Sequence, residues 1–347
     1  MECKVCGKKF PLSQTLGVCL DCLYKGEDRT KDIVQRLHRE TRLNFNLPPL
    51  PLRDKQGITC KLCVNNCKIG KDKVGYCGLR KNVDGHLINL GGTSEDGILE
   101  WYYDLLPTNC VADWVCLGKR MSGYKNMAVF YKSCTFNCLF CQNWHYRYKD
   151  SKSITSKDLA SFVDEKTACI CYFGGDPASQ MMHAIATSKI ALKQKNVMIC
   201  WETNGSMNRK LLEEAAEISL YSNGCIKFDL KAFDESLHHA LCGTSNKNTL
   251  KNFEYLATVA RKRLSPPFLI ASTLLVPYYI TPDEVKKIAL FIKGCSSDIP
   301  YALLAFHPQF YMKDLPTTSR KQAEECLKVS YEVGLKNVRI GNIYLLS

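Results

Sequence analysis

From about residue 126 onward, short apolar runs alternate with longer amphipathic stretches. β-branched and aromatic residues gather in seven runs, which predict strands at 127–131, 169–173, 197–202, 225–229, 268–275, 301–306 and 337–340. The intervening stretches predict helices at 156–165, 177–193, 208–219, 246–263, 281–293 and 319–333. Such alternation is typical of a parallel sheet or barrel. Six β–α units and a seventh strand fall short of a complete eight-unit barrel, so we predict an α/β fold, a partial (β/α)6 TIM-type barrel.

The residues before this region follow a different pattern, in which cysteine and glycine replace regular apolar spacing. A predicted helix at 30–43 leads into the stretch LPPLPL, which predicts an extended linker. The sequence therefore predicts four parts: a four-cysteine zinc-ribbon-like module, a helix with its linker, a second cysteine-rich module with its lead-in, and the barrel. Their bounds are 1–26, 27–57, 58–125 and 126–347.

Hydropathy gives no indication of a membrane protein or a secreted one. The chain has 347 residues, of which 46% are hydrophobic and 23% charged, as in an ordinary soluble domain with a core. No run approaches the roughly 18–20 apolar residues of a membrane span, and the start, MECKVCGKKF, lacks the apolar core of a secretory signal. We expect a cytoplasmic protein without a membrane partner.

The formal net charge of +13 raises the question of nucleic-acid binding. Thiolates bound to metal would reduce this charge to about +8. The lysines are scattered, and no basic run is interleaved with aromatic residues. Charge therefore favours an acidic partner only weakly and gives nucleic acid little support.

Twenty cysteines in a chain without an export signal indicate metal binding, because a reducing cytosol keeps thiols free. The first spaced set consists of Cys3, Cys6, Cys19 and Cys22. Its two Cys-x2-Cys pairs predict a tetrahedral zinc site, with iron as the alternative. So short a segment has almost no core, so the metal would supply its folding energy.

A second set of four cysteines follows within eighteen residues, and glycines beside it suit the tight turns of a metal-binding loop. Its members are Cys60, Cys63, Cys67 and Cys77. Their spacing suits zinc or an iron–sulfur cluster equally. Nine further cysteines have no local ligand spacing. Of these, Cys169, Cys171, Cys200 and Cys225 are interpreted as small core residues rather than ligands. Cys110 and Cys116 either join an auxiliary site or pack, and packing is favoured.

Polar and glycine-rich motifs follow five of the predicted strands. They are SCTFNCLFC, GGDP, TNG, DLK and HP, after the first, second, third, fourth and sixth strands. In folds of this class the chemistry lies at the carboxyl ends of the strands. The first motif carries Cys134, Cys138 and Cys141, and three thiolates on one loop can hold three irons of a 4Fe–4S cluster and leave the fourth open.

This Cys-x3-Cys-x2-Cys motif, with Phe140 in the aromatic position, closely resembles that of the radical S-adenosylmethionine (radical SAM) superfamily. The resemblance covers nearly the whole chain beyond residue 58. It points to the activating-enzyme branch, related to pyruvate formate-lyase activating enzyme and most similar to AmmeMemoRadiSam-type and archaeal proteins. The matching stretches are CKLCVNNCKIGKDKVGYCGLRKN, CTFNCLFCQNW, YFGGDP, WETNG, IKFDLKAFDESLHHALCG, FHPQFYM and VRIGN.

The resemblance implies a reduced 4Fe–4S cluster that cleaves SAM to a 5′-deoxyadenosyl radical, with ferredoxin or flavodoxin as electron donor. It places Gly174, Gly175 and Asp176 at the amino group of SAM, where fixed acceptors suit an ammonium. The other residues that it places near SAM are Phe140, Thr203, Asn204, Asp229, Lys231, His307, Arg339 and Asn342. Each of these roles has a structural alternative. For Gly174 and Gly175 it is a strand-ending turn, and for Asn204 it is an Asn-Gly turn. For Asp229 and Lys231 it is a surface ion pair, and for His307 it is a place in the core.

Two features depart from the family pattern. Residues 1–26 lie outside the core resemblance, and Asp176 stands where glutamate is commoner. Both leave the substrate open.

The leading hypothesis is a radical SAM enzyme that abstracts hydrogen from a peptide or protein. One alternative is a cobalamin-dependent peptidyl C-methyltransferase of the kind that acts on glutamine in methyl-coenzyme M reductase, although no Asp-x-His-x-x-Gly signature is present. A second alternative is RNA modification, in which binding would fall steeply with salt. A non-enzymatic metal scaffold would not explain the five strand-end motifs.

Overall fold

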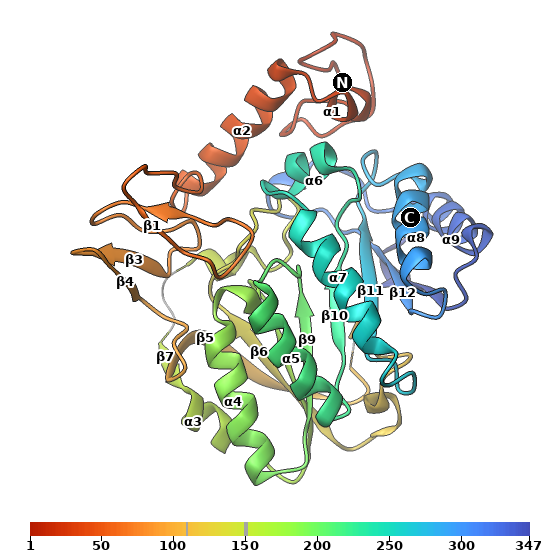
Figure 1. Cartoon of the computed structure of the whole chain (residues 1–347). Helices are drawn as coiled ribbons and strands as arrows, with labels where there is room; N and C mark the ends of the chain where they lie inside the picture. The colour runs from red at the N-terminus through yellow and green to blue at the C-terminus, as the bar shows by residue number, and fades with distance from the viewer. Residues whose placement is uncertain (109, 149–151) are drawn as a thin grey trace.

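A nine-stranded sheet forms the centre of the molecule. The structure is a computed structural model that describes residues 1–108, 110–148 and 152–347. The strands follow the order β13-β12-β11-β10-β9-β8-β6-β5-β7. Figure 1 labels most of them, from β7 on the left to β12 on the right. Seven of them run parallel: β6 (Lys125–Tyr131), β8 (Thr167–Phe173), β9 (Met198–Thr203), β10 (Ile226–Asp229), β11 (Leu269–Leu275), β12 (Tyr301–Ala305) and β13 (Val338–Gly341).

These parallel strands are the seven that the apolar runs predict, and each observed strand starts and ends within two residues of the predicted one. The α/β fold with a mainly parallel sheet is therefore confirmed. Among the described residues the sheet has two edge strands, β13 and β7. The partial barrel stays a prediction.

The sheet extends further toward the N-terminus than the sequence predicts. β5 (Asp96–Leu105) pairs antiparallel with β6, and β7 (Ser153–Thr155) pairs antiparallel with β5. The strand β5 escapes prediction because its aromatic residues Trp101, Tyr102 and Tyr103 are consecutive and break the alternation of a half-buried strand. The lead-in before residue 126 is thus continuous with the sheet.

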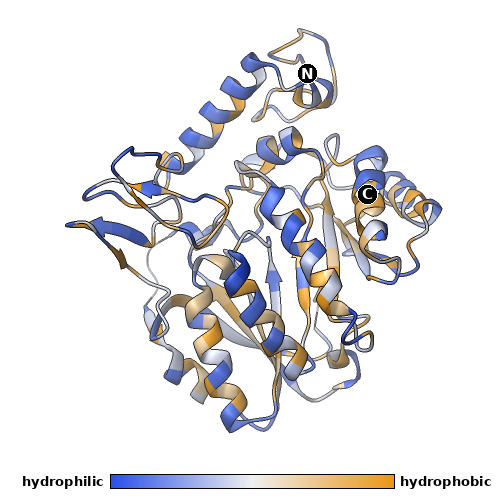
Figure 2. Ribbon diagram, viewed as in Figure 1, coloured by the Kyte–Doolittle hydropathy of each residue, from blue (hydrophilic) through white to orange (hydrophobic). Residues whose placement is uncertain are grey.

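Helices pack along the sheet and connect its parallel strands. They are α3 (Ser156–Ser161), α4 (Met181–Gln194), α5 (Arg209–Tyr221), α6 (Glu235–Cys242), α7 (Lys247–Ala260), α8 (Pro282–Cys295) and α9 (Arg320–Val333). Hydrophobic and hydrophilic residues alternate along α4, α5 and α7 in Figure 2, as expected of helices with one buried face. The predicted start of α8 is confirmed, since the Thr281 hydroxyl accepts a hydrogen bond from the Glu284 amide. The short α6 was not predicted.

The N-terminal part consists of two helices and two small hairpins. The helices are α1 (Leu20–Lys25) and α2 (Asp28–Leu43), and the hairpins pair β1 (Ile58–Thr59) with β2 (Lys68–Ile69) and β3 (Arg80–Val83) with β4 (His86–Asn89). The four-cysteine unit docks on the sheet domain through side chains. The Tyr24 hydroxyl donates to Glu284 at 3.0 Å, and the Ser13 amide donates to the Tyr279 hydroxyl at 3.0 Å. Within the described ranges, the helices are all too short or too polar to cross a membrane.

Candidate active site

The carboxyl ends of β6, β8, β9 and β10 surround an open cavity of about 880 Å³. It brings together most of the residues that the sequence places at SAM, although they lie far apart along the chain. The predicted residues that line it are Cys134, Cys138, Phe140, Cys141, Gly174, Gly175, Asp176, Asn204, Asp229 and Lys231. This convergence follows from the parallel sheet, because the carboxyl ends of its strands meet at one edge.

The cysteine loop after β6 is held by backbone hydrogen bonds to a distant helix. The amides of Asn137 and Leu139 donate to the carbonyls of Cys242 and Leu241, at 2.8 and 2.9 Å. On the other side the Asn65 side chain, from the second cysteine-rich module, donates to the Thr135 carbonyl at 2.7 Å. The loop is therefore fixed between α6 and the N-terminal part, so its three thiols are positioned in advance.

A fourth thiol lies beside this loop. Cys242, at the end of α6, is fully buried, and its hydrogen bond to Cys138 is the largest cause that raises the pKa of the Cys138 thiol, ahead of burial. Sequence reasoning missed Cys242 as a neighbour of the site because ligand spacing is a local signal. The sequence signal for this cysteine is the segment DESLHHALCG, which ends one residue after Cys242 and belongs to a stretch that matches the radical SAM family.

The charges around the three thiols fit an anionic thiolate cluster. Burial raises the pKa of Cys141 to about 11, while the nearby Arg147 and Lys231 act in the opposite direction. Two nitrogens of the buried Arg147 guanidinium, Nε and Nη2, have no hydrogen-bond partner in the part of the chain that the structure describes. Three cysteines with cations beside them are a suitable donor set for a 4Fe–4S cluster with one open iron.

The two glycines after β8 are required by the packing of the backbone. Gly174 has φ +67°, and a side chain there would come within 2.3 Å of the Phe130 ring. A side chain at Gly175 would come within 2.3 Å of the Tyr131 and Ser133 carbonyl oxygens. Only glycine allows the ends of β6 and β8 to approach so closely. The expected contact of these glycines with SAM stays a prediction.

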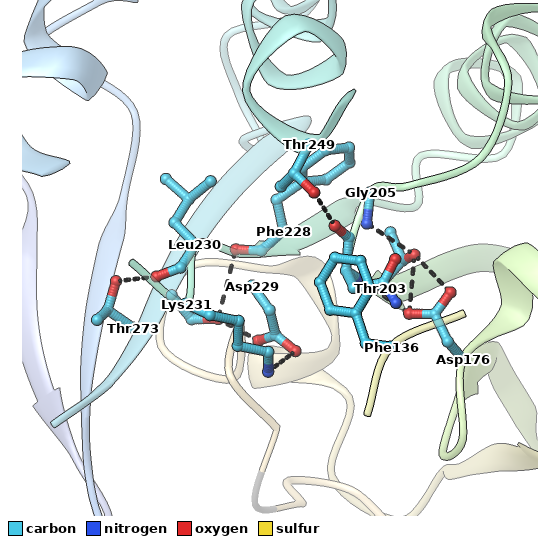
Figure 3. Close-up of polar contacts among 12 residues, drawn as sticks. Phe136, Asp176, Thr203, Gly205, Phe228, Asp229, Leu230, Lys231, Thr249 and Thr273 are labelled. Carbon is cyan, nitrogen blue, oxygen red and sulfur yellow. Dashed lines mark hydrogen bonds and ion pairs between the residues drawn. The ribbon is translucent and has the colours of Figure 1, made fainter. Parts of the chain in front are cut away.

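Asp176 binds the neighbouring strand end rather than pointing freely into the cavity (Figure 3). Its carboxylate accepts hydrogen bonds from the amides of Ala178 and Asn204, both at 2.7 Å, and from the Thr203 hydroxyl at 3.1 and 3.2 Å. The side chain is almost fully buried, and this burial raises its pKa to about 7 despite these donors. Asp176 therefore fixes the end of β9 relative to β8.

Asn204 links this acid to the cysteine loop. Its side-chain amide donates to the Thr135 hydroxyl at 2.9 Å and lies 3.8 Å from the Cys134 sulfur. The Thr249 hydroxyl of α7 donates to the Asn204 carbonyl at 2.6 Å. A single chain of hydrogen bonds thus runs from Asp176 to the loop that carries the thiols.

Asp229 and Lys231 form an ion pair of 2.6 Å at the end of β10 (Figure 3). Burial alone would lower the pKa of Lys231, but the Asp229 carboxylate outweighs it and raises this pKa. The side chains are only 24% and 17% exposed, and Ser272 donates to the carboxylate at 2.8 Å. The pair lines the cavity, so the alternative of a surface ion pair is wrong.

Four predicted residues lie elsewhere among the described positions. Thr203 is buried behind the cavity, where it donates to Asp176. His307 is exposed and does not line the cavity, so the alternative of a core histidine is wrong. Arg339 and Asn342 line a neighbouring cavity of about 650 Å³, where Arg339 pairs with Asp113 at 2.7 Å.

The four N-terminal thiols form a close group. The sulfurs of Cys3, Cys6, Cys19 and Cys22 all lie within 4.8 Å of one another, with 3.9 Å from Cys3 to Cys22 and 4.0 Å from Cys6 to Cys19. A tetrahedral zinc ion with bonds of about 2.3 Å needs sulfurs about 3.8 Å apart. These four thiols therefore fit a single metal ion.

The second set of four thiols is more open. Burial raises the pKa of Cys63, and charges on Cys77, Cys67 and Cys60 raise it further, so the four lie in one neighbourhood. Among the described residues, however, the N-terminal unit alone brings three or more metal-binding side chains within 4.8 Å. The expectation of a metal at Cys60, Cys63, Cys67 and Cys77 stays a prediction.

Comparison with known proteins gives one family model and several distant relatives. Residues 128–292 match the model of the radical SAM superfamily. An uncharacterized protein of Methanocaldococcus jannaschii is 24% identical over 306 residues, which cover 84% of this chain and 83% of that protein. A second protein of this organism, provisionally named a glycyl-radical enzyme activating enzyme, is 27% identical over 58% of this chain and 74% of its own length.

Two further matches are shorter or weaker. The pyruvate formate-lyase 1-activating enzyme of Escherichia coli is 27% identical over 139 residues, which cover 37% of this chain and 54% of that enzyme. Among solved structures, a domain of a pyruvate-formate lyase-activating enzyme from Bacteroides vulgatus is 19% identical with a TM-score of 0.40. It matches over 50% of this chain and 99% of its own.

Proposed function

The chain carries a radical SAM domain and is an enzyme, and from that premise we propose that it abstracts a hydrogen atom from a peptide or protein substrate. The observation that supports the proposal is the single cavity that three thiols share with the Gly-Gly-Asp and Asp-x-Lys motifs. Two of the relatives carry names of activating enzymes, which act on proteins.

Cys134, Cys138 and Cys141 would hold the 4Fe–4S cluster. A cluster held there would supply the electron for the reductive cleavage of SAM to methionine and a 5′-deoxyadenosyl radical, and this radical would abstract the substrate hydrogen. The protein positions the reactants. Asp176 and Asn204 keep the strand ends in place, and the Asp229–Lys231 pair presents both charges to a zwitterionic ligand.

A second cavity of about 800 Å³ provides space for a substrate beside the thiols. It shares Cys134 and Tyr146 with the first cavity and is also lined by Arg147. The guanidinium of Arg147 places a positive charge beside this cavity, which favours carbonyl or carboxylate oxygens there. A polypeptide offers such acceptors at every residue, which supports the proposed substrate class.

The test follows the hydrogen atom. The reconstituted, reduced enzyme would be incubated with SAM and with perdeuterated total protein or perdeuterated total RNA from the cells that express it. We expect deuterium in 5′-deoxyadenosine only with the protein fraction, and not with the Cys138→Ala variant. Deuterium transfer from RNA, or from neither fraction while SAM is cleaved, would contradict the proposal. Cobalt in the purified protein would favour the methyltransferase alternative instead.

A further inference from the structure

Six cysteines line a separate cavity of about 580 Å³ near the amino ends of the parallel strands. They come from four segments of the chain, and none of them belongs to the spaced sets. They are Cys110, Cys116, Cys169, Cys171, Cys200 and Cys225. Their convergence arises from strand pairing, since Cys171 on β8 is in register with Cys200 on β9.

The thiols surround a buried lysine. The Lys227 side chain is 1% exposed, and its ammonium lies 3.0 Å from the Cys171 sulfur and 3.1 Å from the Cys110 sulfur. Its carboxylate partner among the described residues is Glu202 at 3.2 Å. A buried ammonium is costly unless anions compensate it. Neutral thiols are weak acceptors, whereas thiolates bound to a metal would compensate the charge of the ammonium well.

Simple packing does not explain this arrangement. Cysteine is a common small core residue, but an apolar core gains nothing from an ammonium placed among its thiols. The Cys169 thiol has an ordinary hydrogen-bond role, since it donates to the Asn126 side chain at 3.2 Å. The remaining five sulfurs and one cation resemble the composition around Cys134, Cys138 and Cys141.

The separations of the sulfurs distinguish a cluster from a single ion. Cys200 and Cys225 are 3.9 Å apart, but within the described ranges no third metal-binding side chain of this cavity joins such a pair within 4.8 Å. One tetrahedral ion would need four sulfurs at about 3.8 Å. A multi-iron cluster places iron and sulfide between its ligands and therefore needs thiolates that are farther apart.

We propose that this cavity binds a second iron–sulfur cluster. Its ligands are Cys110 and Cys116 from the covering loop, Cys171 from β8, and one member of the Cys200–Cys225 pair, with Lys227 as the compensating cation. Cys200 precedes Thr203 by three residues on β9, which is about 10 Å at about 3.3 Å per residue. The second centre would thus lie close to the active-site cavity, which Glu202 also lines.

The first experiment counts iron and sulfide in anaerobically reconstituted full-length protein. The test variant is Cys110→Ser with Cys116→Ser, two half-buried positions in a loop, and the control is Cys326→Ser, a buried cysteine of α9 outside the cavity. We expect the test variant to lose about four irons and four sulfides per chain, and the control none. Unchanged iron and sulfide in the test variant, or loss of zinc instead, would overturn the proposal.

A second measurement does not depend on the folding of a cysteine variant. Lys227→Met removes the cation, so the reduction potential of one cluster should become more negative in a spectroscopic redox titration. A cluster at Cys134, Cys138 and Cys141 can be recognised because SAM perturbs its spectrum, and this SAM-sensitive signal should be unaffected. If the wild type did not cleave SAM, the proposed function would be contradicted. If it cleaved SAM but showed no SAM-insensitive cluster signal that shifts in Lys227→Met, only this inference would be contradicted.

Discussion

The N-terminal unit and the loop after β6 both carry closely spaced cysteines, yet folding places them in opposite situations. In the N-terminal unit four sulfurs meet within 4.8 Å and leave space for one ion. In the loop three thiols face an open cavity that is also lined by three acids and a lysine. Similar sequence spacing therefore indicates only that a metal binds. The surrounding fold determines whether that metal stabilises a structure or meets a substrate.

The two regions also differ in how they prepare their thiols for a metal. Burial raises the pKa of Cys3, but backbone amides of Cys6 and Cys19 outweigh it and lower this pKa to about 6. For Cys134, burial dominates and keeps the pKa well above its ordinary value. Within the N-terminal unit only Cys3 shows a lowered pKa, since burial raises the pKa of Cys19 and Cys22. Those two thiols and the loop therefore depend on the metal to form thiolates.

The largest effect that separates the regions is expected for Cys138→Ala. Without this ligand the loop should not retain a cluster, so iron should fall by about four atoms per chain while zinc remains. Elemental analysis with sulfide determination checks this result. If zinc fell together with iron, the two regions would not be independent metal sites.

The converse change is Cys3→Ser together with Cys22→Ser. Since residues 1–26 have almost no core of their own, we expect the loss of about one zinc ion per chain and rapid proteolysis of this segment. SAM cleavage should persist, because the site residues lie on other elements. Limited proteolysis and zinc analysis provide the measurement, and retention of zinc or loss of iron would argue against a single-ion site.

A smaller effect is expected for Asp176→Asn. The ionised carboxylate accepts three donors at the strand ends, and its pKa of about 7 means that it ionises across neutral pH. SAM affinity should therefore rise between pH 6 and pH 8 in the wild type. The variant should bind about tenfold more weakly, the loss of roughly one strong hydrogen bond, with a flat pH profile.

The same raised pKa has a consequence for stability. Because the folded state holds the Asp176 proton more tightly than the unfolded chain does, the stability that this group contributes is greatest at low pH. That contribution should decrease as pH rises from about 4 to about 7. Denaturant titrations of wild type and Asp176→Asn would detect it, and identical pH dependences would contradict the assignment.

The smallest effect is expected for Tyr24→Phe. This change removes the hydrogen bond to Glu284 that docks the N-terminal unit on α8, at a cost of about 1 kcal/mol. Zinc content and SAM cleavage should not change. Thermal unfolding of the variant, with Tyr221→Phe at an exposed position as control, would show whether docking contributes to stability.

Sequence periodicity was sufficient for the parallel strands, because each is a buried run of apolar residues between helices of ordinary length. It failed for β5, whose exposed aromatic residues break the pattern, and for α6, which is short. At the site, motifs at strand ends located the cavity residues. They did not reveal that Asp176 accepts a hydrogen bond from the Asn204 amide, because hydrogen-bond partners depend on tertiary distance.

The cysteines show the same limit more clearly. Local spacing found the sets at 3–22, 60–77 and 134–141, but not Cys242 beside Cys138 or the thiols around Lys227. Those thiols are brought together by strand register and by the packing of a loop, which no spacing rule describes. Without such a spacing, a single cysteine in an apolar run is indistinguishable from a small core residue.

The central claim is that the thiols of the loop, and not those of the N-terminal unit, support the chemistry. The most direct test measures 5′-deoxyadenosine from SAM with reduced, reconstituted wild type, Cys138→Ala and Cys6→Ser assayed side by side. We predict product from the wild type and from Cys6→Ser, and none above the enzyme-free level from Cys138→Ala. Product from Cys138→Ala, or its absence from Cys6→Ser in correctly folded protein, would contradict the account.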